Sequence, residues 1–252
     1  MNPSKFLNKI FAIINIGTIR MVYLHIEKSA GTSQRIFLND NFGEDRIFWY
    51  GINSDAKKFN LDEIQDRHLI GGHRFFDFYN NPNYIYLAVV REPIDSIVSL
   101  YSYFITQPHH MANWGLKDGF DASSLENTLN DCEEFRQRIK DHQCRYFSHD
   151  KLFNNAIKTI RKNNFMVGCL PQLALFNNSL FESLDLAVSP FPKTNTRKKG
   201  LNNKITLNLT SKKLLNDLLK NDILLYDYIL NECNGLFNNI NAKTWAKFIK
   251  KI

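Results

Sequence analysis

The chain has 252 residues, of which 44% are hydrophobic and 23% charged, so its composition excludes disordered, collagen-like and coiled-coil classes. A formal net charge of +7 predicts an anionic partner, such as a nucleotide, a polyanion, a nucleic acid or a membrane surface. The four cysteines are far apart and form no CxxC pair, so we expect free thiols rather than a zinc site or a disulfide framework.

The length predicts a single domain over residues 1–252. We expect an N-terminal extension at 1–20, a core from about 21 to 230, and a basic, solvated C-terminal helix within 231–252. The extension contains a short apolar run at 11–19, about half of the ~20 residues that a bilayer span needs. This run predicts packing on the domain, or peripheral contact with a membrane.

Short apolar runs alternate with amphipathic stretches, which is typical of an α/β fold with a mainly parallel sheet. The strongest strand is expected at 84–90, and Pro93 then favours the start of a helix. In chain order, we expect a strand at 21–26, a helix at 31–38, strands at 68–71 and 84–90, helices at 93–105, 124–147 and 152–162, a strand at 164–169, and a long helix from an N-cap at Thr210 to 229. Loops are expected at 107–121 and, with a basic character, at 191–200.

Three polar segments follow predicted strands. They are residues 28–33, the pair Gly72 and His73, and Arg91. Ligands of a parallel α/β sheet bind beyond the carboxyl ends of its strands, so these segments are the first candidates for a site.

The segment at 28–33 supplies small residues, hydroxyls and one ammonium group just before a predicted helix. Free backbone N–H groups and the helix dipole favour a phosphate or sulfate there. A tight turn with a capping hydroxyl would explain the same residues. The segment is not a Walker A loop, because Lys28 precedes Gly31 and a Walker A lysine follows the glycine. A P-loop kinase also needs a magnesium-binding acid, and the sequence shows no identifiable one.

Two segments carry a resemblance to a known family. Residues 25–33, HIEKSAGTS, are similar to the phosphosulfate loop of the Golgi-type carbohydrate sulfotransferases, which include the heparan sulfate and uronosyl 2-O-sulfotransferase branch. Residues 89–101, VVREPIDSIVSLY, resemble the segment of that family that reads a 3′-phosphate. The resemblance implies a P-loop-like three-layer fold, 3′-phosphoadenosine 5′-phosphosulfate (PAPS) as donor, adenosine 3′,5′-bisphosphate (PAP) as product, and no metal.

The resemblance also implies roles for individual residues. Arg91 and Ser99 would hold the 3′-phosphate, although Ser96 stands where many relatives carry arginine. His73, in a segment similar to the family's G-H-x-x-F strand end, would be the catalytic base, and Glu27 is a competing candidate. Lys28 would act both in catalysis and, with its neighbours, in binding the phosphosulfate: Lys28, Ser29, Ala30, Gly31, Thr32 and Ser33. Arg197 and Lys198 fall where relatives place a loop over the nucleotide, and either cofactor or polyanion contact fits them.

Weaker matches at 141–147, 165–168 and 221–226 extend the resemblance to roughly residues 21–228. The relatives act on saccharide hydroxyls, so we expect a glycan acceptor, and the positive charge favours an acidic one. Aromatic residues that could stack on sugar faces are Phe75, Phe76, Tyr101, Tyr103 and Trp114. Tyrosyl, lipid and small-alcohol acceptors stay open, and nucleic acid is not expected as a partner because no familiar binding module is visible.

Two further readings are left open. A non-catalytic module that binds nucleotides or polyanions would share the basic cleft, and a P-loop kinase would share the sheet. The animal relatives are anchored in the Golgi, whereas the first predicted strand here begins about twenty residues into the chain. We therefore expect a cytoplasmic protein of the short bacterial type, with peripheral membrane contact through 11–19. The oligomeric state is not predicted.

Overall fold

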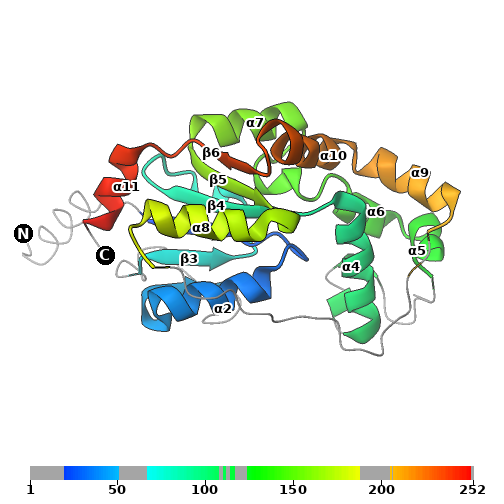
Figure 1. Ribbon diagram of the computed structural model, residues 1–252. Coiled ribbons are helices and arrows are strands. Elements are labelled where there is room, and N and C mark those ends of the chain that lie inside the picture. Colours follow the sequence, from blue (N-terminus) through cyan, green and yellow to red (C-terminus); the bar gives the residue numbers. More distant parts are fainter. Residues whose placement is uncertain are drawn as a thin grey trace, which may run out of the picture.

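The computed structural model describes residues 20–50, 67–107, 110–111, 114–116, 124–187, 205 and 207–250. Within these residues, six strands form one sheet in the spatial order β2-β3-β1-β4-β5-β6 (Figure 1). The strands are β1 (Met21–Leu24), β2 (Ile47–Trp49), β3 (Leu69–Gly72), β4 (Ile85–Val90), β5 (Asn164–Cys169) and β6 (Leu236–Asn238). Neighbours are parallel except β6, which pairs antiparallel with β5.

The central strands β1 and β4 are buried along their whole length. Their sequences, MVYL and IYLAVV, are the continuous apolar runs that a parallel strand covered on both faces requires. Leu24, at the end of β1, lies opposite Gly72 of β3 and Ala88 of β4. The carboxyl ends of these three strands therefore meet at one edge of the sheet.

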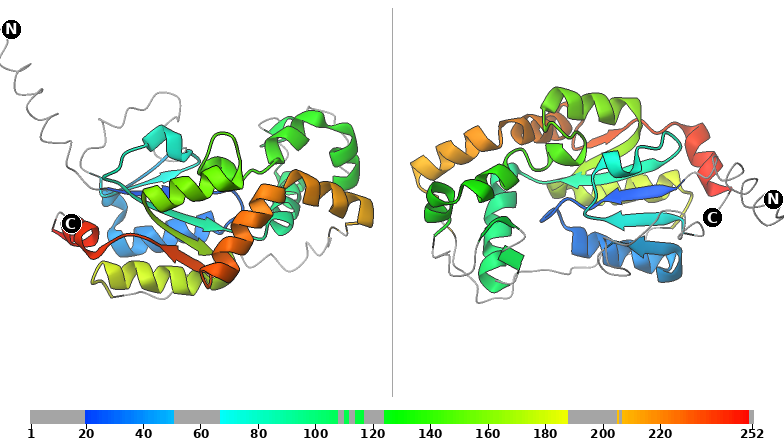
Figure 2. Two further views of the ribbon diagram at one scale, coloured as in Figure 1. Left: turned by 90° about the horizontal axis from the view of Figure 1, so that it is seen from above. Right: turned by 180° about the vertical axis from the view of Figure 1, so that it is seen from behind.

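Helices cover both faces of the sheet, so the fold has three layers (Figures 1 and 2). One face packs against α2 (Gly31–Phe42), α8 (Leu173–Ser183) and α11 (Ala242–Ile249), and the other against α3 (Phe76–Tyr79), α7 (Phe153–Lys162) and α10 (Lys220–Asp227). Successive strand residues alternate between these two cores. The predicted α/β fold with a mainly parallel central sheet is confirmed.

A third apolar cluster lies beyond the carboxyl edge of the sheet, on the right of Figure 1. It joins α4 (Pro93–Thr106), α5 (Leu125–Asp131), α6 (Glu133–Ile139) and α9 (Leu209–Leu218). The Glu92 carboxylate fixes the start of α4, because it accepts hydrogen bonds from the N–H groups of Ile94 and Asp95. Short segments complete the described chain: the 3₁₀ turns η2 (Glu44–Arg46), η5 (Cys144–Tyr146) and η6 (Leu170–Gln172), and the π-helical η7 (Tyr228–Glu232).

Two long predicted helices are each broken in two. The helix expected at 124–147 is interrupted at Cys132, whose backbone is extended, and it ends before η5. The helix expected from Thr210 is capped by Asn208 instead and breaks at Leu219. There, α10 starts anew because the distant Asp141 carboxylate accepts the N–H of Asn221 at 2.8 Å. No local sequence signal marks this break.

Four elements have no counterpart in the prediction: β2, α3, α8 and β6. The basic helix expected within 231–252 does not span this whole range, because residues 236–238 form the edge strand β6. The helix itself is present as α11, but it is not fully solvated, because Trp245 and Phe248 are buried against the sheet. Residues 1–19 lie outside the described residues.

Candidate active site

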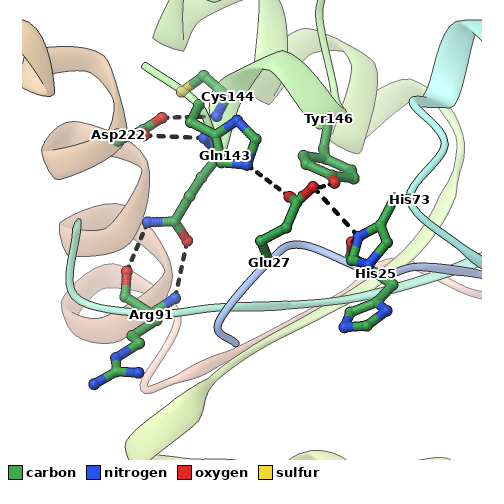
Figure 3. A network of polar contacts seen from close by, with 9 residues as sticks. His25, Glu27, His73, Arg91, Gln143, Cys144, Tyr146 and Asp222 are labelled. Atoms are coloured by element: carbon green, nitrogen blue, oxygen red, sulfur yellow. Dashed lines mark hydrogen bonds and ion pairs between the residues drawn. The ribbon is translucent and has the colours of Figure 1, made fainter. Parts of the chain in front are cut away.

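The site forms where the strands β3, β1 and β4 end side by side, and Figure 3 shows its polar side chains. His25 and the loop behind it follow β1, His73 follows β3, and Arg91 follows β4. The N–H of His25 donates to the carbonyl of Gly72 at 3.0 Å, which ties the first two segments together. Gly72 has φ +144°, and a Cβ there would lie 2.6 Å from Cβ of Tyr50, so glycine is needed to place His73.

The loop between β1 and α2 is tightly folded and opens on a helix N-terminus. Lys28 and Ala30 both have left-handed backbone conformations, with φ of 63° and 62°. The N-cap residue of α2, Ala30, makes no side-chain capping hydrogen bond, and the helix begins directly after the loop. The Ser29 hydroxyl is buried and has no hydrogen-bond partner among the described residues. Such a loop is suited to an anion.

Gly31 is fixed by the close approach of His25. A Cβ at position 31 would lie 1.5 Å from Nε2 of His25. The His25 ring in turn stacks on the His73 ring, with 4.0 Å between centroids. Burial, with a smaller contribution from His73, lowers the pKa of His25 to about 3. We conclude that His25 is a neutral spacer between the loop and His73.

The Lys28 ammonium lies over the ring of Tyr103 in α4, 4.4 Å from the centroid. Tyr103 also stacks on His110, with 5.3 Å between centroids. Burial, and then the neighbouring Arg91, lower the pKa of Lys28. The aromatic face compensates part of this cost, since it attracts a cation.

Arg91 connects the end of β4 to the loop. Its Nη1 donates to the carbonyl of Lys28 at 3.0 Å. Its backbone is held on both sides by Gln143, which accepts the Arg91 N–H at 2.9 Å and donates to the Arg91 carbonyl at 2.8 Å. Buried Asp222 accepts the backbone N–H groups of Gln143 and Cys144 and thereby anchors this contact (Figure 3). A guanidinium so placed can bind an anion in the loop.

His73 presents the Nδ1 edge of its ring to the described part of the chain. Its Nδ1 lies 2.8 Å from the carbonyl of His25, and a carbonyl only accepts, so Nδ1 carries the proton. In the neutral ring, Nε2 is then an acceptor. The side chain is 48% exposed. His73 therefore has the geometry of a general base.

Glu27, the competing candidate for the base, lies next to the Nδ1 edge of His73. Its Oε2 accepts from Nε2 of His142 and from the hydroxyl of Tyr146, both at 2.6 Å, and its Oε1 lies 3.4 Å from Nδ1 of His73. Burial alone would raise the pKa of Glu27, but His142, His73 and Tyr146 together hold it well below its usual range. Sequence reasoning missed His142 and Tyr146 as site residues, although both lie in the segment 141–147 that shows the weak resemblance.

The structure brings together Lys28, Arg91 and His73, and the loop residues between Lys28 and Ser33. Ser99 lies half-buried on α4, between the buried Ser96 and Leu100. Arg197 and Lys198 lie outside the described residues. Two of the predicted sugar-stacking aromatics, Phe76 and Tyr101, are buried in apolar clusters and are unsuited to that role, whereas Phe75, Tyr103 and Trp114 are partly exposed.

Clusters of metal ligands and membrane-spanning helices are both absent from the described part of the chain. No group of three or more histidine, cysteine, aspartate or glutamate residues there is arranged to hold a metal ion. In the same residues, no helix combines the length and the apolar character needed to cross a membrane.

Comparison with known proteins identifies the family. The model of the sulfotransferase family matches residues 13–229, which include every described residue of the site. No curated protein gives a significant match. The anion loop and the facing histidine lie at one edge of the sheet, within the matched residues. Because the match covers most of the chain, the chain belongs to the sulfotransferase family.

Proposed function

We propose that the chain transfers the sulfuryl group of PAPS to a hydroxyl of a carbohydrate acceptor, as in the heparan sulfate and uronosyl 2-O-sulfotransferase branch. One observation carries the proposal. The anion loop, the Arg91 guanidinium and the His73 ring, which follow three different strands, converge at one sheet edge, with Arg91 bonded to the Lys28 carbonyl.

The residues at the loop fit the donor. A buried hydroxyl without a partner in the described part of the chain, that of Ser29, and an uncapped helix N-terminus both suit the 5′-phosphosulfate. When bound, PAPS supplies the sulfuryl group and leaves as PAP. The loop from Lys28 to Ser33 would hold the phosphosulfate, and Arg91 and Ser99 the 3′-phosphate. Arg197 and Lys198 would contact the nucleotide or a polyanion.

The chain's own groups would then act on the acceptor. His73 accepts the proton of the acceptor hydroxyl at Nε2, while Nδ1–H stays bonded to the carbonyl of His25. Lys28 and the first N–H groups of α2 are placed to stabilise the negative charge that develops as the sulfuryl group is transferred. No step here calls on a metal.

An acidic glycan is the acceptor that the surroundings of His73 favour. Arg74 follows the base, and the Arg145 guanidinium lies 4.5 Å from the centroid of the Phe75 ring. Positive charge beside an aromatic face suits a sugar that carries a carboxylate or sulfate. We propose no nucleic-acid partner, a cytoplasmic location, and peripheral membrane contact through residues 11–19.

Ligand-dependent thermal stability tests the donor site. At a concentration of PAP about 100 times its Kd, binding contributes about 2.7 kcal/mol and should raise the Tm by roughly 5–10 °C. ATP with magnesium should have a smaller effect. Stabilisation by ATP with magnesium alone would favour a P-loop kinase. Stabilisation by PAP without transfer to any acceptor in a broad panel would favour a non-catalytic binding module.

Two variants then test the chemistry. Lys28→Ala should lower the rate of sulfuryl transfer by about 10²–10³ and leave the Tm nearly unchanged. His73→Ala should lower the rate by about 10²–10⁴ and retain binding of PAP, measured by calorimetry. An unchanged rate for either variant contradicts the role given to that residue.

A further inference from the structure

Glu27 is held in a cage of hydrogen-bond donors directly behind His73. Both donors to Oε2 are themselves fixed: Tyr146 is buried among aromatic rings, and His142 is buried between Trp114 and Tyr146. The remaining oxygen, Oε1, faces Nδ1 of His73. Figure 3 shows the carboxylate between Tyr146 and His73.

Two acceptors face Nδ1 of His73, and they have different effects on the ring. The carbonyl of His25, at 2.8 Å, decides which nitrogen carries the proton. The Glu27 carboxylate, at 3.4 Å, is a weaker hydrogen-bond acceptor, and it carries a negative charge that faces the ring. A negative charge at this distance favours the protonated ring over the neutral ring.

We propose that Glu27 is a positioning residue that stabilises the imidazolium formed when His73 accepts the acceptor's proton, and this inference rests on the proposed function. The proton moves from the acceptor hydroxyl to Nε2 of His73, the acceptor oxygen forms the new bond to sulfur, and the bond from sulfur to the bridging oxygen of PAPS breaks. Glu27 takes up no proton in this step.

Two observations argue against Glu27 as the base itself. Its Oε2 is already committed to two donors, and its Oε1 points to His73. The low pKa of this carboxylate also makes it a poor proton acceptor. The Nδ1 of His142 is buried with no hydrogen-bond partner among the described residues, whereas its Nε2 faces Oε2 of Glu27.

Other charged groups act on the same rings. The titratable groups around His25, Glu27 and His73 come from the loop after β1, from α2, from the turn that leads into η5 and from η5 itself, and they are Lys28, Arg35, His142 and Tyr146. Of all these groups, Glu27 is the one with an oxygen directed at Nδ1 of His73, so its removal tests the inference.

The test follows the His73 ring directly by ¹⁵N NMR in the full chain, with His73→Gln used for assignment. In Glu27→Gln, the protonated His73 ring should lose the facing carboxylate, so the titration midpoint should lie at lower pH than in the wild type. Nδ1–H should remain the protonated site of the neutral ring. The rate of transfer should fall about tenfold, and its acid limb should move to lower pH by the same amount.

Tyr146→Phe is the matched control, because it removes a buried donor to Glu27 but keeps the carboxylate. It should leave the His73 midpoint near that of the wild type. Equal midpoints in wild type and Glu27→Gln overturn the inference, as does an equal shift in Tyr146→Phe. A rate in Glu27→Gln as low as in His73→Ala, with an unmoved midpoint, would make Glu27 the base. If the wild type transfers no sulfuryl group, the proposed function fails, and the NMR midpoints still decide the role of Glu27.

Discussion

The contact between Lys28 and Tyr103 holds the loop's ammonium group in place. Burial disfavours this charge, and the aromatic face offsets part of that cost. We expect Tyr103→Leu to lower kcat/KM for the donor by roughly 2- to 30-fold, corresponding to about 0.5–2 kcal/mol. Tyr103→Phe keeps the ring and should retain nearly full kcat/KM. Steady-state kinetics would measure both, and equal losses in the two variants would assign the effect to the hydroxyl instead.

Gly31 leaves no room for a side chain beside His25. Gly31→Ala should therefore displace the His25 ring or the loop, at a cost of about 1–3 kcal/mol in the free energy of unfolding. Binding of PAP should weaken as well. Urea unfolding would measure the cost, with Asp40→Ala as the control, since Asp40 is exposed on the same helix. A Gly31→Ala variant as stable as the wild type would show that the ring adjusts without strain.

At the scale of single residues, sequence reasoning placed the loop, His73 and Arg91 correctly at one sheet edge. Each of these follows an apolar strand directly, so its position depends mainly on the local pattern. The cage around Glu27 was not predicted, because His142 and Tyr146 lie more than a hundred residues away and reach it only through tertiary packing.

At the scale of elements, two buried carboxylates form reciprocal caps, each accepting backbone N–H groups from the segment that carries the other. Asp141, which precedes η5, accepts the N–H of Asn221 at the start of α10, and Asp222 of α10 accepts the N–H groups of Gln143 and Cys144 in the η5 turn. This exchange joins α10 to the segment that holds Arg91. The position of Arg91 therefore depends on an element far from it in the sequence.

Asp222 should make stability fall as pH rises. Burial raises its pKa to about 6, from an ordinary 3.8, against the opposing effect of its two backbone hydrogen bonds. The folded state then binds a proton more tightly than the unfolded state, so this contribution is complete below about pH 4 and lost as pH rises through 6. The change amounts to about 3 kcal/mol.

Asp222→Asn removes this titration. Free energies of unfolding in urea would be measured for both proteins at pH 4 and at pH 7. The free energy of the wild type minus that of Asp222→Asn should be smaller at pH 7 than at pH 4. Asp217→Asn, on the exposed side of α9, is the control. Its free energy of unfolding should differ from that of the wild type by the same amount at both pH values. If the difference between wild type and Asp222→Asn is the same at both pH values, Asp222 titrates equally in the folded and the unfolded state.

Elements with strong local signals were predicted well, and those that depend on distant partners were not. The strands β1, β3, β4 and β5 and the start of α4 follow from apolar runs and from Pro93. The breaks at Cys132 and Leu219 follow from packing and from the Asp141 cap, and β6 forms only because β5 offers it an edge. A run of three residues in an Asn-rich segment carries too little pattern to predict a strand.

At the scale of the whole molecule, the net charge of +7 bears on the choice of acceptor. A positive field raises the rate at which an acidic glycan meets the cleft and has no such effect on a neutral glycan. The Arg145 side chain beside Phe75 provides a local contribution that can be separated from this general field.

Ionic strength should therefore discriminate between acceptors. Raising salt from about 0.1 to 1 M shortens the Debye length from about 10 to about 3 Å, so KM for an acidic glycan should rise several-fold at saturating donor, while KM for its neutral analogue changes little. Arg145→Gln should raise KM for the acidic glycan at low salt and flatten this dependence. Lys158→Gln removes one exposed charge from α7 and is the matched control, because it lowers the net charge equally without touching the Phe75 contact. Equal effects of the two substitutions would assign acceptor selection to the overall field, and a KM independent of salt would exclude an acidic acceptor.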